Sequence, residues 1–370
     1  MQTPQNSTRT PVKRAYAENY LLISITAFAA SVILTRLFLE ITGYPQVGNS
    51  VLHIAHALWG GLLLIVAIMV PLILSNRWAI ALSALLSGLG VGLFVDEVGK
   101  FITQSNDYFY PPAAPLIYAI FLLLVLLFLF VRHASRRSPR VEMYRALGDL
   151  RELIDNNLDR LELENLIARL DTAQGSDHPH IAGLSATIST YLRETEIPLV
   201  PVKPGLLKRF NRWLSQWGHR LGRDRHRWLI IACLALMSAS ALFTVLVLLY
   251  IAISPQATFQ DMVALFMTEV EIESVGSGFW FILRITLQTL VGMIAALAVV
   301  LLVQRRDQLG IVAALAALLT SLTGVLLLTF YLNQFSAVTG ALLQSGILLL
   351  VLFYQRWYLE VPDKNEEMVQ

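Results

Sequence analysis

The sequence predicts an all-α polytopic membrane protein: a bundle of eight transmembrane helices with a small helical insert in the cytoplasm. Three observations lead to this fold class. Hydrophobic residues make up 56% of the 370 residues and charged residues only 15%, whereas a soluble domain carries about a quarter charged residues. The apolar residues gather in runs of about 20, the length that crosses a bilayer. The basic residues gather between these runs and largely on one side.

Eight apolar runs are long enough to span a membrane. Each is expected to be a helix, because a lone strand cannot satisfy its backbone hydrogen bonds in lipid. The expected spans are 20–42, 51–74, 78–98, 114–132, 228–253, 278–303, 309–331 and 335–355.

The distribution of lysine and arginine predicts the orientation, because cytoplasmic loops of membrane proteins are enriched in these residues. With both termini in the cytoplasm, 25 of the 28 basic residues lie on the cytoplasmic side, most of them in segment 132–227. The other three, Arg36, Lys100 and Arg284, fall toward the outer side. The opposite orientation would invert this count, so we expect the N-terminus and the C-terminus to be cytoplasmic.

The spans divide the chain into two similar halves. Each half has four spans and begins and ends inside, and the letters “QTLVG” (288–292) stand in span six about where “HALWG” (56–60) stands in span two. This similarity suggests a parallel 4+4 repeat, although shared apolar composition would produce it equally well. The expected domains are a first membrane half with a polar cluster (1–132), a cytoplasmic insert (133–227), a second membrane half (228–356) and a cytoplasmic tail (357–370).

The insert is predicted to be helical. Leucine and isoleucine recur at helical spacing in two stretches, which predicts a hairpin of amphipathic helices, and residues 180–197 suggest a third helix. A small structural domain is the first interpretation, and a surface for self-association or for a protein partner over 139–196 is the alternative. Residues 203–221 combine a leucine, phenylalanine and tryptophan face with basic residues, which is typical of a helix lying on anionic phospholipid. The adjacent span favours this membrane surface over nucleic acid.

Ionisable residues of several spans fall at one depth. A helix rises about 1.5 Å per residue, so distances along each span can be counted from its cytoplasmic end. The residues that reach the outer interface by this count are Glu40, His56, Asp96 and Arg284, with Arg36 about one turn deeper and His53 and Lys100 about one turn higher.

Their spacing predicts a shared cluster. Arg36 and Glu40, like Asp96 and Lys100, are four residues apart and can lie on one helix face. Asp96 and Glu97 point about 100° apart, so we expect one carboxylate to meet the face of His53 and His56 and the other to pair with Arg36 or Lys100. Small residues that allow close helix approach are Gly60, Gly61, Gly88 and Gly92.

The cluster is compatible with acid–base or metal chemistry. The candidate catalytic residues are His53, His56, Asp96 and Glu97, one histidine being a general base oriented by a carboxylate. Candidates for binding an anionic substrate group or for charge pairing are Arg36, Glu40, Lys100 and Arg284. The same histidines and carboxylates could bind a divalent metal such as zinc if a third ligand joins them; which metal, if any, is unknown. A structural ion network is the alternative.

The block “TRLFLEITGYP…LHIAHALWGG…GLFVDEVGKFI…NDYFYPPAAP” resembles an uncharacterised bacterial family of multi-pass membrane proteins. A histidine that opens one helix in “HALWGG”, followed by an acidic pair that ends the next in “VDEVGKF”, resembles VanZ-like membrane proteins linked to glycopeptide resistance over residues 45–102. Gly48, Asn49 and Ser50 stand where VanZ-like chains usually have Asp-Lys. The resemblances imply the cytoplasmic (inner) membrane of a bacterium and an envelope-related role.

Three functions remain open from the sequence. The first is an enzyme that acts on a lipid or lipid-linked substrate in the outer leaflet through the cluster. The second is a non-catalytic envelope or assembly protein. The third is a transporter that uses the cluster as an ion relay, a function that favours polar residues near the membrane midplane and broken helices, in which this chain is poor.

Overall fold

The computed structural model describes residues 11–43, 55–105, 107, 110–133, 138–201, 222–253, 275–333 and 337–359. These residues form helices and one isolated backbone bridge between Asp159 and Val200, which confirms the all-α class. Within them, eight helices are long and apolar enough to cross a membrane, as expected. They are Ala17–Thr42, His56–Ile73, Arg77–Asp96, Ala113–Arg132, Arg223–Tyr250, Gly278–Val303, Asp307–Leu332 and Val338–Tyr358.

The chain forms two compact units. The first consists of residues 1–98 with 121–205, and the second of residues 99–120 with 206–370. The boundary lies inside the fourth span, so the early part of this span belongs to the second unit and its later part to the first. The insert belongs to the first unit. The parallel repeat of the two membrane halves stays a prediction.

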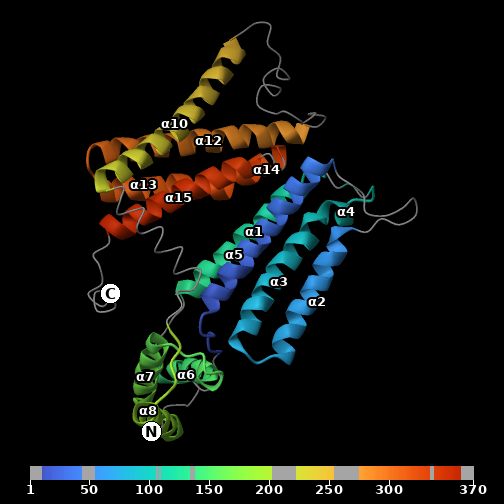
Figure 1. Cartoon of the computed structure of the whole chain (residues 1–370). Coiled ribbons are helices and arrows are strands. Elements are labelled where there is room, and N and C mark those ends of the chain that lie inside the picture. The colour runs from blue at the N-terminus through green and yellow to red at the C-terminus, as the bar shows by residue number, and fades with distance from the viewer. Residues whose placement is uncertain are drawn as a thin grey trace, which may run out of the picture. The chain divides into compact units, whose positions relative to one another are not determined.

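In the first unit, three membrane helices lie side by side with α3 in the middle (Figure 1). Glycines on two faces of α3 let its neighbours approach. A Cβ on Gly88 would collide with the carbonyl oxygen of Ser24 in α1, and a Cβ on Gly60 in α2 would lie 2.7 Å from the carbonyl oxygen of Gly90. The helices of this layer are α1 (Ala17–Thr42), α2 (His56–Ile73) and α3 (Arg77–Asp96).

Close glycine packing was therefore predicted correctly at three positions. Gly92 joins Gly60 and Gly88, because its Cβ would lie 2.7 Å from the Cβ of Ser31. The prediction was wrong for Gly61, which has nothing within 4 Å of the added Cβ. Gly61 is one residue further round α2 than Gly60 and so faces away from α3.

The insert forms a three-helix bundle with a core of its own, which confirms the expected hairpin and third helix. Ser138 caps the first helix by accepting from the amide of Val141, and Asp159 and Glu162 form a capping box at the second. Leu166 and Leu170 are fully buried in the core. The helices are α6 (Pro139–Ile154), α7 (Arg160–Gln174) and α8 (Pro179–Glu194). The expected interfacial helix at 203–221 lies outside the described residues.

Polar contacts attach the insert to the short turn between α2 and α3. Arg151 donates to the carbonyl of Ser75 at 3.0 Å, and Asn76 donates to Asp155 at 2.8 Å. Arg77 pairs with Glu162 at 2.9 Å. The insert and the first membrane helices are therefore one structural unit.

The second unit has its own apolar core, whose fully buried residues include Leu234, Leu302 and Leu318. Tyr118, from the early part of α5 (Ala113–His133), donates to the carbonyl of Leu322 at 2.7 Å. The seventh span contains a π-helical turn, η1. The elements are α4 (Val98–Ile102), α10 (Arg223–Ile253), α12 (Val275–Val303), α13 (Asp307–Thr320), η1 (Ser321–Val325), α14 (Leu326–Asn333) and α15 (Val338–Tyr358).

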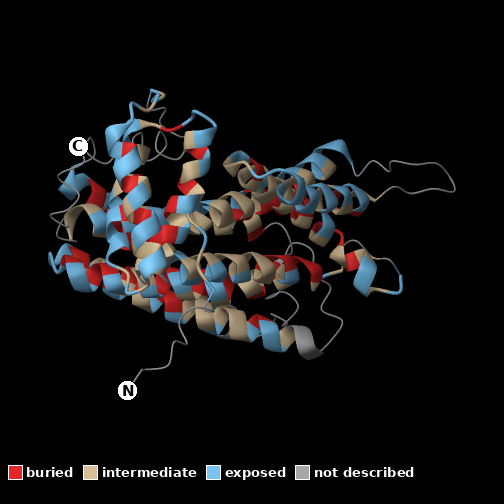
Figure 2. Cartoon of the chain, turned by 90° about the horizontal axis from the view of Figure 1, so that it is seen from below, coloured by how far each residue is buried: buried red, intermediate tan, exposed pale blue. Residues whose placement is uncertain are grey.

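The membrane helices expose large apolar side chains. Figure 2 shows buried residues interspersed with long exposed stretches on the helices. Ile73 is 74% exposed, Phe130 71% and Leu236 74%. Such continuous apolar faces are unfavourable in water and suit contact with lipid, in agreement with an integral membrane protein.

Adding one methyl group at two glycines separates packing from helix propensity. Gly88→Ala places its Cβ against the Ser24 backbone and should destabilise the protein by about 1–3 kcal/mol. Gly61→Ala meets open space and should be neutral or stabilising by up to about 1 kcal/mol. Melting temperatures of the two purified variants in the same detergent measure the difference. Equal melting temperatures would contradict the α1–α3 packing.

Candidate functional site

Asp96, the last residue of α3, joins three helices. Its side chain is fully buried and accepts a hydrogen bond from Nε of Arg36 in α1 at 2.6 Å. Its second oxygen, Oδ2, lies 3.1 Å from Nε2 of His56 in α2. One carboxylate is thus shared between a guanidinium and an imidazole from two other helices.

The cluster also satisfies the ends of these helices. The last carbonyls of a helix lack partners within it and carry partial negative charge. Nη2 of Arg36 donates to the carbonyl of Asp96 at 2.9 Å and so satisfies one of them. At the start of α2, the N-cap Ala55 provides no side-chain hydrogen bond, and Oε2 of Glu97 accepts from the amide of Ala57 at 3.0 Å instead. Glu97 is therefore a cap supplied by another helix.

His56 is the accessible member of the group. Its side chain is 22% exposed, whereas those of Arg36, Asp96 and Glu97 are 9%, 0% and 1% exposed. A carboxylate at Nε2 favours the tautomer with the proton on that nitrogen. The lone pair is then on Nδ1, which lies 3.7 Å from Oε2 of Glu97.

The structure brings together four of the predicted site residues, Arg36, His56, Asp96 and Glu97. Asp96 pairs with Arg36 and Oε2 of Glu97 lies 3.7 Å from Nδ1 of His56, as the expected division between the carboxylates requires, but Asp96 also contacts His56 through its second oxygen. Arg36 donates to Asp96 rather than pairing with Glu40, which is exposed. His53 lies outside the described residues.

Two predicted residues belong to the second unit. Lys100 lies in α4, and the turn at Glu97 separates α4 from α3. Asp96 and Lys100 therefore do not share one continuous helix, contrary to the expectation from their spacing. Arg284 lies on α12 and lines a different cavity.

The described part of the chain contains no ready set of metal ligands. No three histidine, cysteine, aspartate or glutamate side chains there are arranged to hold an ion. In the cluster, Asp96 and Glu97 direct oxygens at Arg36 and at the amide of Ala57. Zinc at His53, His56, Asp96 and Glu97 stays a prediction, since His53 is not described.

The Arg284 cavity has a volume of about 250 Å³ and lies among α10, α12, η1, α14 and α15. Polar side chains line it, and Nε of Arg284 and Oε1 of Gln344 are buried without a hydrogen-bond partner among the described residues. The π-helical turn η1 contributes part of the wall, and such turns are frequent at functional sites. The polar lining residues are Ser240, Arg284, Gln288, Ser321, Thr329 and Gln344.

A second buried ion cluster escaped the sequence argument. Asp307, the first residue of α13, is 6% exposed and accepts from Arg223 and from the hydroxyl of Tyr354, each at 2.8 Å. Arg227 lies 3.9 Å from its other oxygen. The sequence does contain a signal for this cluster. Asp307 is an acidic residue at the start of an apolar span, directly after Arg305 and Arg306, and those two arginines served only to predict the orientation of the chain.

Comparison with models of protein families, with curated proteins and with solved structures found no match. The resemblances to a bacterial membrane family and to VanZ-like proteins therefore stay predictions. The fold and the site together define a multi-pass helical membrane protein with charged residues buried between its helices.

A double-mutant cycle measures the buried pair. Arg36→Met or Asp96→Asn leaves a buried group without its partner and should cost about 3–5 kcal/mol of unfolding free energy. The double variant should cost less than the sum of the two, by about 1–3 kcal/mol. Unfolding by denaturing detergent provides the measurement. Glu40→Gln, an exposed change on the same helix, is the control and should shift stability by less than about 0.5 kcal/mol. Additive single effects would contradict the pairing.

Proposed function

We propose that this protein is a membrane enzyme that acts on a lipid or lipid-linked substrate, with His56 as its general acid–base residue. The observation that carries the proposal is the contact of 3.1 Å between Nε2 of His56 and the buried carboxylate of Asp96, which Arg36 holds in place. A histidine oriented by a fixed carboxylate is the arrangement that proton transfer in catalysis requires.

The proposed role of each residue in the cluster follows from how far its side chain is exposed. Asp96 fixes the imidazole through its contact with Nε2, and Arg36 holds the Asp96 carboxylate in place by pairing with it. His56 is partly exposed and presents Nδ1 to take a proton from a hydroxyl or a water molecule. Arg36 and Glu97 are engaged with helix ends, so they position the pair rather than bind substrate.

The location argues for a substrate with a lipid part. The cluster lies where α1 and α3 end and α2 begins, surrounded by helices with exposed apolar faces. The asymmetry of basic residues supports the location of these ends at the outer surface of the membrane. A substrate anchored in that leaflet would bring its headgroup to the depth of His56.

His56→Gln tests the proposal, because glutamine can still hydrogen-bond but cannot transfer protons at neutral pH. Proteoliposomes made with a total bacterial lipid extract are incubated with wild type or variant, and products are identified by mass spectrometry. We expect at least one lipid to be converted by the wild type and the rate to fall at least about 100-fold in the variant. His180→Gln, an exposed histidine of the insert, is the matched control.

The same variants distinguish catalysis from a structural ion network. If His56→Gln loses activity and keeps its melting temperature, the catalytic role is supported. If the rate is unchanged, or if product is lost only because the protein unfolds, His56 is not the acid–base residue. The protein is then better described as a non-catalytic envelope or assembly protein whose cluster holds helix ends together.

A second candidate function, binding or passage of an anionic group within the membrane bundle, is favoured by the Arg284 cavity. A cation inside a membrane bundle is costly and usually marks a functional site. The described lining residues include no carboxylate. An anion entering the cavity would meet the guanidinium together with several hydroxyl and amide groups.

Arg284→Met tests this candidate without knowledge of the ligand. If the charge has no fixed counter-ion, its removal should stabilise the ligand-free protein by about 1–2 kcal/mol. Arg223→Met is the matched control, because Arg223 bonds to Asp307, and it should lower stability. Melting temperatures in detergent without phospholipid give the answer. A large loss of stability in Arg284→Met would show instead that Arg284 has a structural partner.

A further inference from the structure

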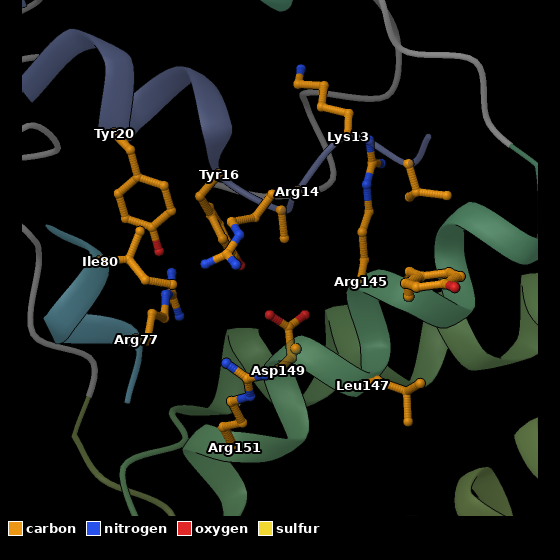
Figure 3. Close-up of a pocket in the computed structure, with 14 residues that line it drawn as sticks. Lys13, Arg14, Tyr16, Tyr20, Arg77, Ile80, Arg145, Leu147, Asp149 and Arg151 are labelled. Carbon is orange, nitrogen blue, oxygen red and sulfur yellow. The ribbon is translucent and has the colours of Figure 1, made fainter. Parts of the chain in front are cut away.

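A second polar cavity lies in the first unit, between the membrane helices and the insert (Figure 3). Its volume is about 440 Å³, within the range of roughly 300–1,000 Å³ typical of small-molecule sites. Three separate segments build it: the approach to α1 and its first turn, the start of α3, and one face of α6. None of its residues belongs to the His56 cluster.

The described lining is rich in cations. It contains the basic residues Lys13, Arg14, Arg77, Arg145 and Arg151, against the single acidic residue Asp149. Figure 3 shows the guanidinium ends of Arg14, Arg77 and Arg151 directed toward the space beside Asp149. These three arginines come from different segments, so the fold rather than a local charge run brings them together.

Three of the cations already have acidic partners at the rim. Lys13 pairs with Glu18 at 3.0 Å, Arg77 with Glu162 at 2.9 Å and Arg145 with Glu142 at 3.0 Å.

The excess of positive charge comes from the other two. Arg151 donates to the carbonyl of Ser75, which is neutral. Within the described residues, neither Arg14 nor Arg151 has a carboxylate within ion-pair distance. Asp149 is bound by Arg169, and burial raises the pKa of its carboxyl while the charge of Arg169 acts in the opposite direction.

The walls of the cavity are fixed in place. The guanidinium carbon of Arg77 lies 4.0 Å from the ring centre of Tyr16 and that of Arg169 lies 5.8 Å from it. Tyr16 has φ of 60°, a left-handed conformation that costs a residue with a side chain roughly 1–2 kcal/mol. Burial raises the pKa of its phenol, so Tyr16 stays protonated and can donate a hydrogen bond. A strained residue held by two arginines indicates a preorganised wall.

We propose that this cavity binds a phosphate group at the membrane surface. Guanidinium forks match the geometry of phosphate oxygens and bind them through paired, charge-assisted hydrogen bonds. Two arginines without acidic partners, a phenol donor and further cations at the rim provide such a site. Because the cavity lies where α1 and α3 begin, the phosphate can belong to a phospholipid headgroup or to a soluble phosphorylated molecule. The proposal is independent of the function assigned to His56.

The test compares two double variants of the full chain. The cavity variant is Arg14→Gln with Arg151→Gln, and the control variant is Arg160→Gln with Arg193→Gln. Arg160 and Arg193 lie on the outer faces of α7 and α8 with side chains 80% and 55% exposed, so the control removes the same charge from outside the cavity. The soluble arm titrates inorganic phosphate and glycerol 3-phosphate into detergent-purified protein and follows binding by calorimetry. The lipid arm measures phosphatidylglycerol retained from mixed phosphatidylglycerol–phosphatidylcholine nanodiscs by native mass spectrometry.

We expect the cavity variant to weaken binding at least about tenfold in one arm, and the control variant to bind like the wild type. Loss in the soluble arm identifies a free phosphorylated ligand, and loss in the lipid arm identifies a headgroup. The proposal is overturned if neither arm detects binding by the wild type. It is equally overturned if both variants weaken binding alike, since the effect then reflects net charge. A melting temperature for each variant confirms that the bundle remains folded.

Discussion

The arrangement of the first unit depends on one buried carboxylate. Asp96 ends α3 and is held by Arg36 from α1 and by His56 from α2. A single aspartate in apolar surroundings would be strongly unfavourable, so these partners must stay in place. That requirement fixes the ends of three helices relative to one another, and the glycine contacts along α3 let their backbones come close enough for the bonds to form.

The same cluster solves a second problem of membrane helices, namely their unsatisfied ends. Arg36 satisfies a carbonyl at the end of α3, and Glu97 satisfies an amide at the start of α2. Each side chain acts on a helix other than its own, because no local capping residue is present at Ala55. Stability and candidate chemistry are therefore combined in one group, and only His56 retains appreciable exposure.

The two units differ in whether their buried charged side chains have partners of opposite charge. In the first, the charges of α1, α2 and α3 are matched within hydrogen-bond distance. In the second, Asp307 is matched by Arg223 and Tyr354, while Arg284 faces a cavity whose described lining offers only neutral partners. Matched charges favour a fixed structure, whereas an unmatched one favours a ligand. The basic cavity beside Tyr16 lies between these extremes, since it contains both paired and unpaired arginines.

The sequence by itself determined the fold class, the eight spans and the helical nature of the insert, because the bilayer imposes length and apolarity on every crossing segment. It also predicted that Asp96 and His56 lie at one depth, with Arg36 about one turn deeper, because helical rise is constant. The tertiary structure alone decided which partners meet. In the tertiary structure Asp96 contacts both Arg36 and His56, α3 ends before Lys100, and Gly61 faces away from α3. The tertiary structure also joins Arg14, Arg77 and Arg151 around one cavity. Such choices depend on the rotation and contact of helices distant in the chain, which periodicity along a single helix does not specify.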